Sequence, residues 1–211
     1  MSIKEINEEI KNCEKCPELV ESRSLAVAGY GDPDADVLFI GLAPGKDGAD
    51  ITGKPFTRDP SGVLLQEMLI EVDLSKSKDP ESESPELDNS FLTNIVKCNP
   101  KKPGENNGLV NRTPTKKEVE NCRDYLSEEI SIINPKIIVP LGRKSADFIW
   151  WKFEIKRIMN WNEAIEKENK IIFPMYHPGF IIRGGGTQKY SRSDYQEDFS
   201  KLKEIINSLK D

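Results

Sequence analysis

Four short apolar runs recur along the chain, and each predicts a buried strand. They are DVLFIGLA at 36–43, SFLTNIVKC at 90–98, KIIVPLG at 136–142 and KIIFPMY at 170–176. Short apolar runs bounded by turn residues are typical of strands that are covered on both faces. We therefore expect four parallel strands.

Helical periodicity fills the intervals between these runs. Apolar positions spaced three or four residues apart occur at 61–72, 115–133, 143–153 and 193–210. The second of these segments opens with Thr115 and Glu118 at the spacing of a capping box, which predicts a helix start. Strands that alternate with helices predict an α/β fold, here a three-layer α/β/α sandwich with a central four-stranded parallel sheet.

The length and composition fit one globular unit. The chain has 211 residues, of which 36% are hydrophobic and 31% charged, so it can bury a core of its own. We expect a single domain over 1–211. The sequence shows neither a signal-like start nor an apolar run long enough to span a bilayer. We expect a soluble, cytoplasmic protein that is a monomer and has no membrane partner.

The net charge of -6 is concentrated in one segment. Residues 71–88 hold seven acidic and two basic side chains, with Pro and Ser between them. This composition predicts a mobile acidic surface insertion at 71–89, and a solvated loop without function is the simplest interpretation. Elsewhere, basic residues gather at 97–123 and 183–192. They could meet phosphates or could be ordinary solvated surface.

Polar chemistry collects where the predicted strands end. The first strand leads into a glycine-rich stretch with Asp47, Asp50 and Phe56, the second reaches Asn94, and the fourth precedes His177, the only histidine. Each residue alone is more often structural. Ligands, however, bind beyond the carboxyl ends of parallel strands. Together these residues predict a pocket that stacks a planar heterocycle on Phe56 and reads its edge through Asn94.

The spacing of the four cysteines leaves their role open. Cys13 and Cys16 form a C-x-x-C pair, Cys98 follows the second strand, and Cys122 lies one helix further on. Such a pair suits a zinc ion, an iron-sulfur cluster or a redox couple. In a reducing compartment a disulfide framework is not expected, which leaves metal ligands or buried inert thiols.

Five motifs in order resemble one known family. GLAPGKDGADITGKPFTRDPSG, FLTNIVKCNP, NRTPT, PLGRKSA and YHPGF follow one another as in the iron-sulfur uracil-DNA glycosylases. The lead-in from Cys13 resembles the family-four branch, whose first motif begins Gly-Glu-Ala-Pro-Gly. Leu42 stands in place of that Glu, and the GLAP start is similar to family five. The first branch implies strict uracil specificity, and the second implies a broader range of deaminated bases.

The resemblance implies a DNA repair enzyme that flips uracil out of DNA and hydrolyses its N-glycosidic bond, leaving an abasic site. In such an enzyme Phe56 would stack on the base, Asn94 would read its edge and His177 would donate to uracil O2. The water-ordering carboxylate would be Asp50, with Asp47 as the second candidate.

The resemblance also implies contacts to the substrate backbone. Phe180 or Ile181 would fill the gap left by the extruded base, and Arg183 or Arg192 would reach phosphates. The stretch 184–186 equally fits a simple flexible link. The pocket wall would include Gly41, Ala43 and Gly45.

A 4Fe-4S cluster is the cofactor that the resemblance implies, held by Cys13, Cys16, Cys98 and Cys122. Its role would be structural, because base excision transfers no electron. The expected partner is uracil-containing DNA, with a replication or repair protein as a further candidate. Two alternatives stay open: a non-catalytic iron-sulfur DNA-binding or damage-sensing module, and a nucleotide-binding transferase, although GLAPG lacks the Lys-Ser/Thr ending of a P-loop.

Overall fold

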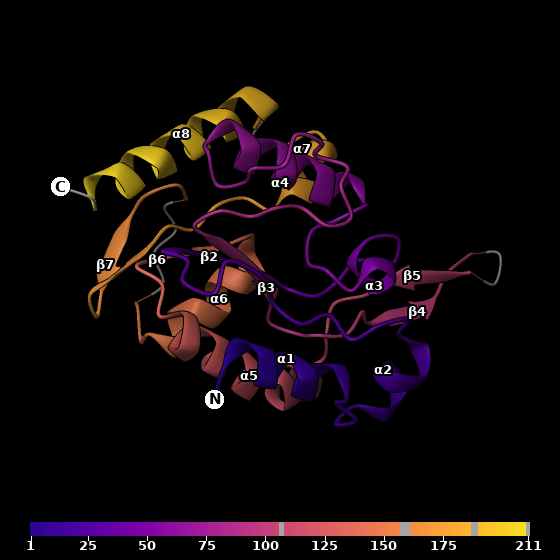
Figure 1. Cartoon of the computed structure of the whole chain (residues 1–211). Helices are drawn as coiled ribbons and strands as arrows, with labels where there is room; N and C mark the ends of the chain where they lie inside the picture. The colour runs from indigo at the N-terminus through magenta and orange to yellow at the C-terminus, as the bar shows by residue number, and fades with distance from the viewer. Residues whose placement is uncertain (106–107, 157–160, 187–189, 210–211) are drawn as a thin grey trace.

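The computed structural model describes residues 1–105, 108–156, 161–186 and 190–209. Its centre is one sheet with the strand order β1-β3-β2-β6-β8-β7 (Figure 1). The four inner strands pair in parallel; they are β2 (Val37–Gly41), β3 (Ser90–Asn94), β6 (Ile137–Pro140) and β8 (Lys170–Ile172). These are the four predicted strands, so the α/β prediction is confirmed.

The sheet is wider than predicted, because an antiparallel strand is added at each edge. These strands are β1 (Tyr30–Gly31), which pairs with β3, and β7 (Ile165–Lys167), which pairs with β8. A separate hairpin joins β4 (Lys101–Pro103) to β5 (Leu109–Asn111). The central sheet therefore has six strands where the sequence predicted four.

Helices cover both faces of the sheet, which gives three layers (Figure 1). One face carries α1 (Ile3–Lys11), α5 (Lys116–Ile133) and α6 (Arg143–Lys152), and the other carries α4 (Pro60–Glu71), α7 (Pro178–Ile182) and α8 (Arg192–Ser208). Two shorter helices, α2 (Pro17–Ser22) and α3 (Ala49–Thr52), lie near the carboxyl ends of the strands. The described part of the chain contains no helix long and apolar enough for a membrane span.

The alternation of side chains along β2 divides the interior into two cores. Leu38 and Ile40 pack with α1, α5 and α6, whereas Val37 and Phe39 pack with α4 and α8. All four side chains are fully buried, as expected for a strand covered on both faces. This packing fixes where β2 and β3 end, and therefore where the residues that follow them lie.

The acidic segment after α4 is anchored to the rest of the protein. Ser75 pairs with Leu87 in an isolated bridge, and the Tyr30 hydroxyl donates to the Pro85 carbonyl at 3.0 Å. Glu83 forms an ion pair with Arg58 at 2.9 Å. The segment lies at the surface, but these contacts hold it in a defined position that its polar composition did not predict.

Candidate functional site

A cavity of about 370 Å³ lies beyond the carboxyl ends of β2 and β3, beside the start of α7. Its wall brings together Phe56, Asn94 and His177, the residues that the sequence placed at the ends of different strands. It also includes Asp59 and Asn111, which were not singled out from the sequence. The wall therefore offers an aromatic ring, three amides, an imidazole and a carboxylate.

Asn94 ends β3 directly opposite Gly41 of β2, and it is 3% exposed. A Cβ atom on Gly41 would clash with Asn94 Oδ1 and would lie 2.6 Å from Cζ of Phe56. A glycine is therefore required there, because any side chain would displace both the amide and the ring. The expected wall residues Ala43 and Gly45 line the cavity, while Gly41 packs behind it.

A buried ion pair between Lys97 and Glu129 supports the end of β3. The Lys97 ammonium, 2% exposed, donates to Glu129 at 2.6 Å, to Thr93 Oγ1 at 2.6 Å and to the Asn94 carbonyl at 2.8 Å. Glu129 also accepts from the Gly29 amide at 3.1 Å. A buried charge is stable only when it is fully hydrogen-bonded, so this network fixes the backbone that carries the Asn94 amide.

Phe56 is held in a left-handed backbone conformation, with φ of 54°. Its carbonyl accepts from Gln66 Nε2 at 3.1 Å, and its ring centroid lies 6.0 Å from that of His177. Such a backbone is unfavourable for a non-glycine residue and persists where surrounding contacts impose it. The turn therefore places the ring against Gly41 and next to the imidazole.

His177 is a neutral hydrogen-bond donor in this site. The Gly179 amide donates to Nδ1 at 3.0 Å, so the ring proton sits on Nε2. Burial, together with the positive charge of Arg183, lowers the pKa of His177 to about 4. The imidazole therefore presents an N–H without a full positive charge near neutral pH.

Neither of the two carboxylates expected to order water is part of the cavity wall. Asp50 is 1% exposed, and Lys101 and Ser24 occupy both of its oxygens at 2.7–3.1 Å. The short helix α3 turns this side chain toward β4, where it ties three segments together. Asp47 is 73% exposed and pairs with Lys46 at 2.8 Å. The geometry therefore does not support either as the water-ordering group.

Asp59 is the one acidic residue among the described residues of the cavity wall. It is the N-cap of α4, where Oδ1 accepts from the Gly62 amide at 2.7 Å. Its Oδ2 lies so near Gly45 that a Cβ atom there would be 2.5 Å away. Burial raises the pKa of Asp59, and the charge of Asp47 adds to this effect. The sequence Asp59-Pro60 predicts a helix start, and an ordinary capping role explains the Asp. For that reason Asp59 was not singled out from the sequence as a site residue.

The segment after His177 forms α7, and its apolar residues differ in exposure. Ile181 is 8% exposed and belongs to the core, whereas Ile182 is 48% exposed. Phe180 stacks on Tyr176 with ring centroids 5.0 Å apart. Of the residues expected to meet DNA here, Arg183 lines the cavity, Phe180 is partly buried, and Ile181 faces inward. Ile182 is thus the apolar side chain that α7 offers to solvent.

The fold brings the four cysteines to one place beside the amino-terminal helices. Arg23 donates to Cys98 Sγ at 3.1 Å, and Asn121 donates to Cys16 Sγ at 3.2 Å. Cys98 and Cys122 are buried in the core that Cys13 and Cys16 also contact. Burial, together with the neighbouring thiols Cys98 and Cys16, raises the pKa of Cys122 to about 11.

The four thiols form one candidate set of metal ligands. Among the described residues, no group of three or more His, Cys, Asp or Glu side chains is close enough to hold one metal ion. Cys98 and Cys16 accept side-chain N–H donors, and Cys98 and Cys122 each interact with neighbouring thiols, so the four cysteines fit an iron-sulfur cluster.

Comparisons with known proteins give consistent results. A family model described as the uracil DNA glycosylase superfamily matches residues 28–203. A Type-4 uracil-DNA glycosylase of Sulfurisphaera tokodaii is 35% identical over 97% of this chain and 84% of its own length. One of Archaeoglobus fulgidus is 33% identical over 97% and 93%. A Type-5 uracil-DNA glycosylase of Pyrobaculum aerophilum is 31% identical over 79% and 78%.

Proposed function

The chain belongs to the uracil-DNA glycosylase superfamily, and from this premise we propose that it removes uracil from DNA by hydrolysing the N-glycosidic bond. The observation that carries the proposal is the cavity in which Phe56, Asn94, His177 and Asp59 converge. The alternative of a non-catalytic sensor is not favoured, because the relatives from Sulfurisphaera tokodaii and Archaeoglobus fulgidus, which match 97% of the chain, are named glycosylases.

Recognition of the base rests on Phe56 and Asn94. The Phe56 ring stacks on the flipped uracil, and the Asn94 amide pairs with its O4 and N3–H edge. Cytosine exchanges a donor for an acceptor on that edge, so one fixed amide orientation rejects it. The Lys97 network supports this selectivity, because it anchors the Asn94 backbone at 2.8 Å.

Bond cleavage rests on His177 and Asp59. As the C1′–N1 bond breaks, its electron pair moves onto uracil, and the Nε2–H of His177 donates to the negative O2. The Asp59 carboxylate stabilises the positive charge on the sugar and orders the water that adds to C1′. The proton lost by that water leaves through Asp59 to solvent. The neutral imidazole and the cavity-lining carboxylate suit these two roles.

The duplex must release the nucleotide before the base can enter the cavity, at a cost of a few kcal/mol. Ile182 on α7 is the exposed apolar side chain suited to fill the gap, and Arg183 beside the cavity suits a phosphate contact. Ile181 would need to leave the core to play the same part, since it is 8% exposed.

We assign a structural role to a 4Fe-4S cluster held by Cys13, Cys16, Cys98 and Cys122. When bound, the cluster supplies cross-links between segments and takes no part in base excision. Cys13 and Cys16 lie between α1 and α2, while Cys98 follows β3 and Cys122 lies in α5. Binding would therefore fasten the amino-terminal helices to the strand that carries Asn94.

The substrate range depends on the first motif. Leu42 lines the cavity at the position where the family-four pattern has Glu. An apolar side chain at that position forms no hydrogen bond with the base. We propose that uracil is the main substrate, with hypoxanthine as the test of a broader range.

A single-turnover assay tests the proposed function. Oligonucleotides with one uracil opposite G, opposite A or unpaired are incubated with the holoprotein and cleaved at abasic sites, with a hypoxanthine duplex as comparison. Release of uracil alone supports the family-four range, and release of both bases supports the family-five range. Binding without any cleavage, with the cluster intact, would contradict the proposal and favour a sensor.

A further inference from the structure

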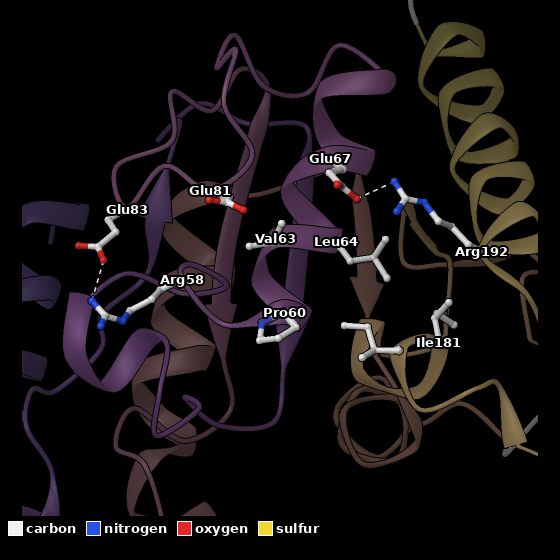
Figure 2. A pocket seen from close by; sticks show the side chains of 10 residues that line it. Arg58, Pro60, Val63, Leu64, Glu67, Glu81, Glu83, Ile181 and Arg192 are labelled. Carbon is white, nitrogen blue, oxygen red and sulfur yellow. Dashed lines mark hydrogen bonds and ion pairs between the residues drawn. The ribbon is translucent and has the colours of Figure 1, made fainter.

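Two grooves flank the base cavity on opposite faces of the sheet, and they differ in charge. The groove between α4 and α7 encloses about 730 Å³ and contains Glu67, Glu81 and Glu83 (Figure 2). Its cations are already paired: Arg58 with Glu83 at 2.9 Å and Arg192 with Glu67 at 2.7 Å. Glu81 is left without an ion pair among the described residues, so the groove repels phosphates.

The groove between α5 and α6 adjoins the base cavity. Leu42 lines both, and Ile95 and Val119 add to the apolar lining of the groove, which encloses about 660 Å³. Trp151 borders the groove and is 62% exposed. Its ring lies 5.6 Å from that of Phe148, tilted by 55°. A large indole so exposed beside a groove offers a stacking surface to a ligand.

Basic side chains surround the indole. Lys116 and Lys144 are exposed and have no ion pair among the described residues. Arg123 lies 3.5 Å from Asp124, but both side chains are more than half exposed, so that contact is weak. Two acidic residues line the groove: Asp147 is paired with Arg143 at 3.2 Å, and the exposed Glu120 is outnumbered by the three cations. The groove can therefore attract phosphates, in contrast to its neighbour.

We propose that the α5–α6 groove binds unpaired DNA of the uracil-containing strand where that strand leaves the cavity, with one base stacked on Trp151 and phosphates near Lys116, Arg123 and Lys144. Aromatic stacking beside cationic side chains is the common chemistry of single-strand binding, and it tolerates any sequence. The shared residue Leu42 places the groove next to the cavity that the strand leaves, while the acidic groove disfavours the opposite direction. This inference rests on the proposed function.

The test compares a uracil-containing trinucleotide with a long single strand. For Trp151→Ala we expect KM on the long strand to rise roughly 5- to 100-fold, the loss of one stacked base, whereas processing of the trinucleotide is unchanged. Trp151→Phe should retain most of the affinity. Indole fluorescence should be quenched when the holoprotein binds a long uracil-free strand, and this quenching should be lost in Trp151→Ala.

Charge variants provide the matched control. Lys144→Gln and Lys116→Gln should each reduce the salt dependence of single-strand binding by roughly 0.7 in log-log slope, and Lys4→Gln on α1 should leave it unchanged. Equal effects of Trp151→Ala on both substrate lengths, or none on either, would overturn the proposal. A change in the oligomeric state of the protein in Trp151→Ala would also overturn the proposal, because the α5–α6 groove would then be a contact between two copies of the chain. Failure to release uracil from any oligonucleotide counts against the proposed function alone, because quenching needs no catalysis.

Discussion

Asp59→Asn should separate catalysis from folding. Asparagine caps a helix as well as aspartate does, so the Gly62 amide at 2.7 Å keeps its acceptor and α4 keeps its start. The variant removes only the negative charge of the cavity wall. A carboxylate about 4 Å from the positive sugar contributes about 4 kcal/mol at an effective dielectric of about 20. That energy corresponds to about 10³-fold in rate.

The assay is single-turnover excision of uracil, measured beside thermal unfolding. For Asp59→Asn we expect a rate about 10²- to 10³-fold lower, since the amide dipole retains part of the stabilisation, with an unchanged Tm. Burial raises the pKa of Asp59, and only its ionised form is active. The wild-type rate should therefore fall as the pH drops through that raised pKa, and the variant should lack this fall.

Asp50→Asn is the control, because it changes a carboxylate that the cavity does not contain. The substitution breaks the buried ion pair between Asp50, 1% exposed, and Lys101, 8% exposed. It should lower the free energy of unfolding by about 3–5 kcal/mol. The folded fraction should excise uracil at close to the wild-type rate. The assignment would be refuted if Asp59→Asn stayed within a few-fold of wild type while Asp50→Asn lost activity.

Three further outcomes are expected. His177→Ala should slow single-turnover excision by about 10²- to 10³-fold with DNA affinity retained, and the wild-type rate should show no inflection near pH 6.5, because the pKa of His177 is about 4; an inflection there would contradict a neutral donor. Asn94→Asp should lose the discrimination between uracil and cytosine, and a variant that still ignores cytosine would show that another group reads the base. Lys97→Met should cost about 3–5 kcal/mol in urea unfolding, and Lys97→Met with Glu129→Gln should recover much of it, since the second change removes the unpaired charge.

The four inner strands could be predicted because a strand buried on both faces requires a continuous run of apolar residues in the sequence. Val37 to Ile40 are all fully buried, and such a run has few alternatives to an inner strand. The edge strands could not be predicted in the same way. β1 is two residues long and β7 three, both are partly exposed, and their pairing depends on a neighbour that tertiary structure supplies.

The convergence of Phe56, Asn94 and His177 at one cavity could be predicted, because Asn94 and His177 lie at or just beyond strand ends and Phe56 lies in the loop that follows β2, and topology gathers those ends. The carboxylate could not. Asp50 lies in a glycine-rich stretch that suggests a ligand loop, but the four residues of α3 turn it toward Lys101. Asp59 reads as an ordinary helix cap, and only the fold around Phe56 brings that cap to the cavity.

Lys97 makes the fidelity of base reading depend on a site in another layer of the protein. Its ammonium donates to the Asn94 carbonyl at 2.8 Å, and the next residue along the chain is Cys98. A disturbance at the thiols would therefore reach the Asn94 amide, the proposed reader of uracil against cytosine, through one residue, Lys97. Under the proposed function, oxidation of the cysteines would in this way disturb the position of Asn94, so that errors in substrate choice would be an early sign of damage at the thiols.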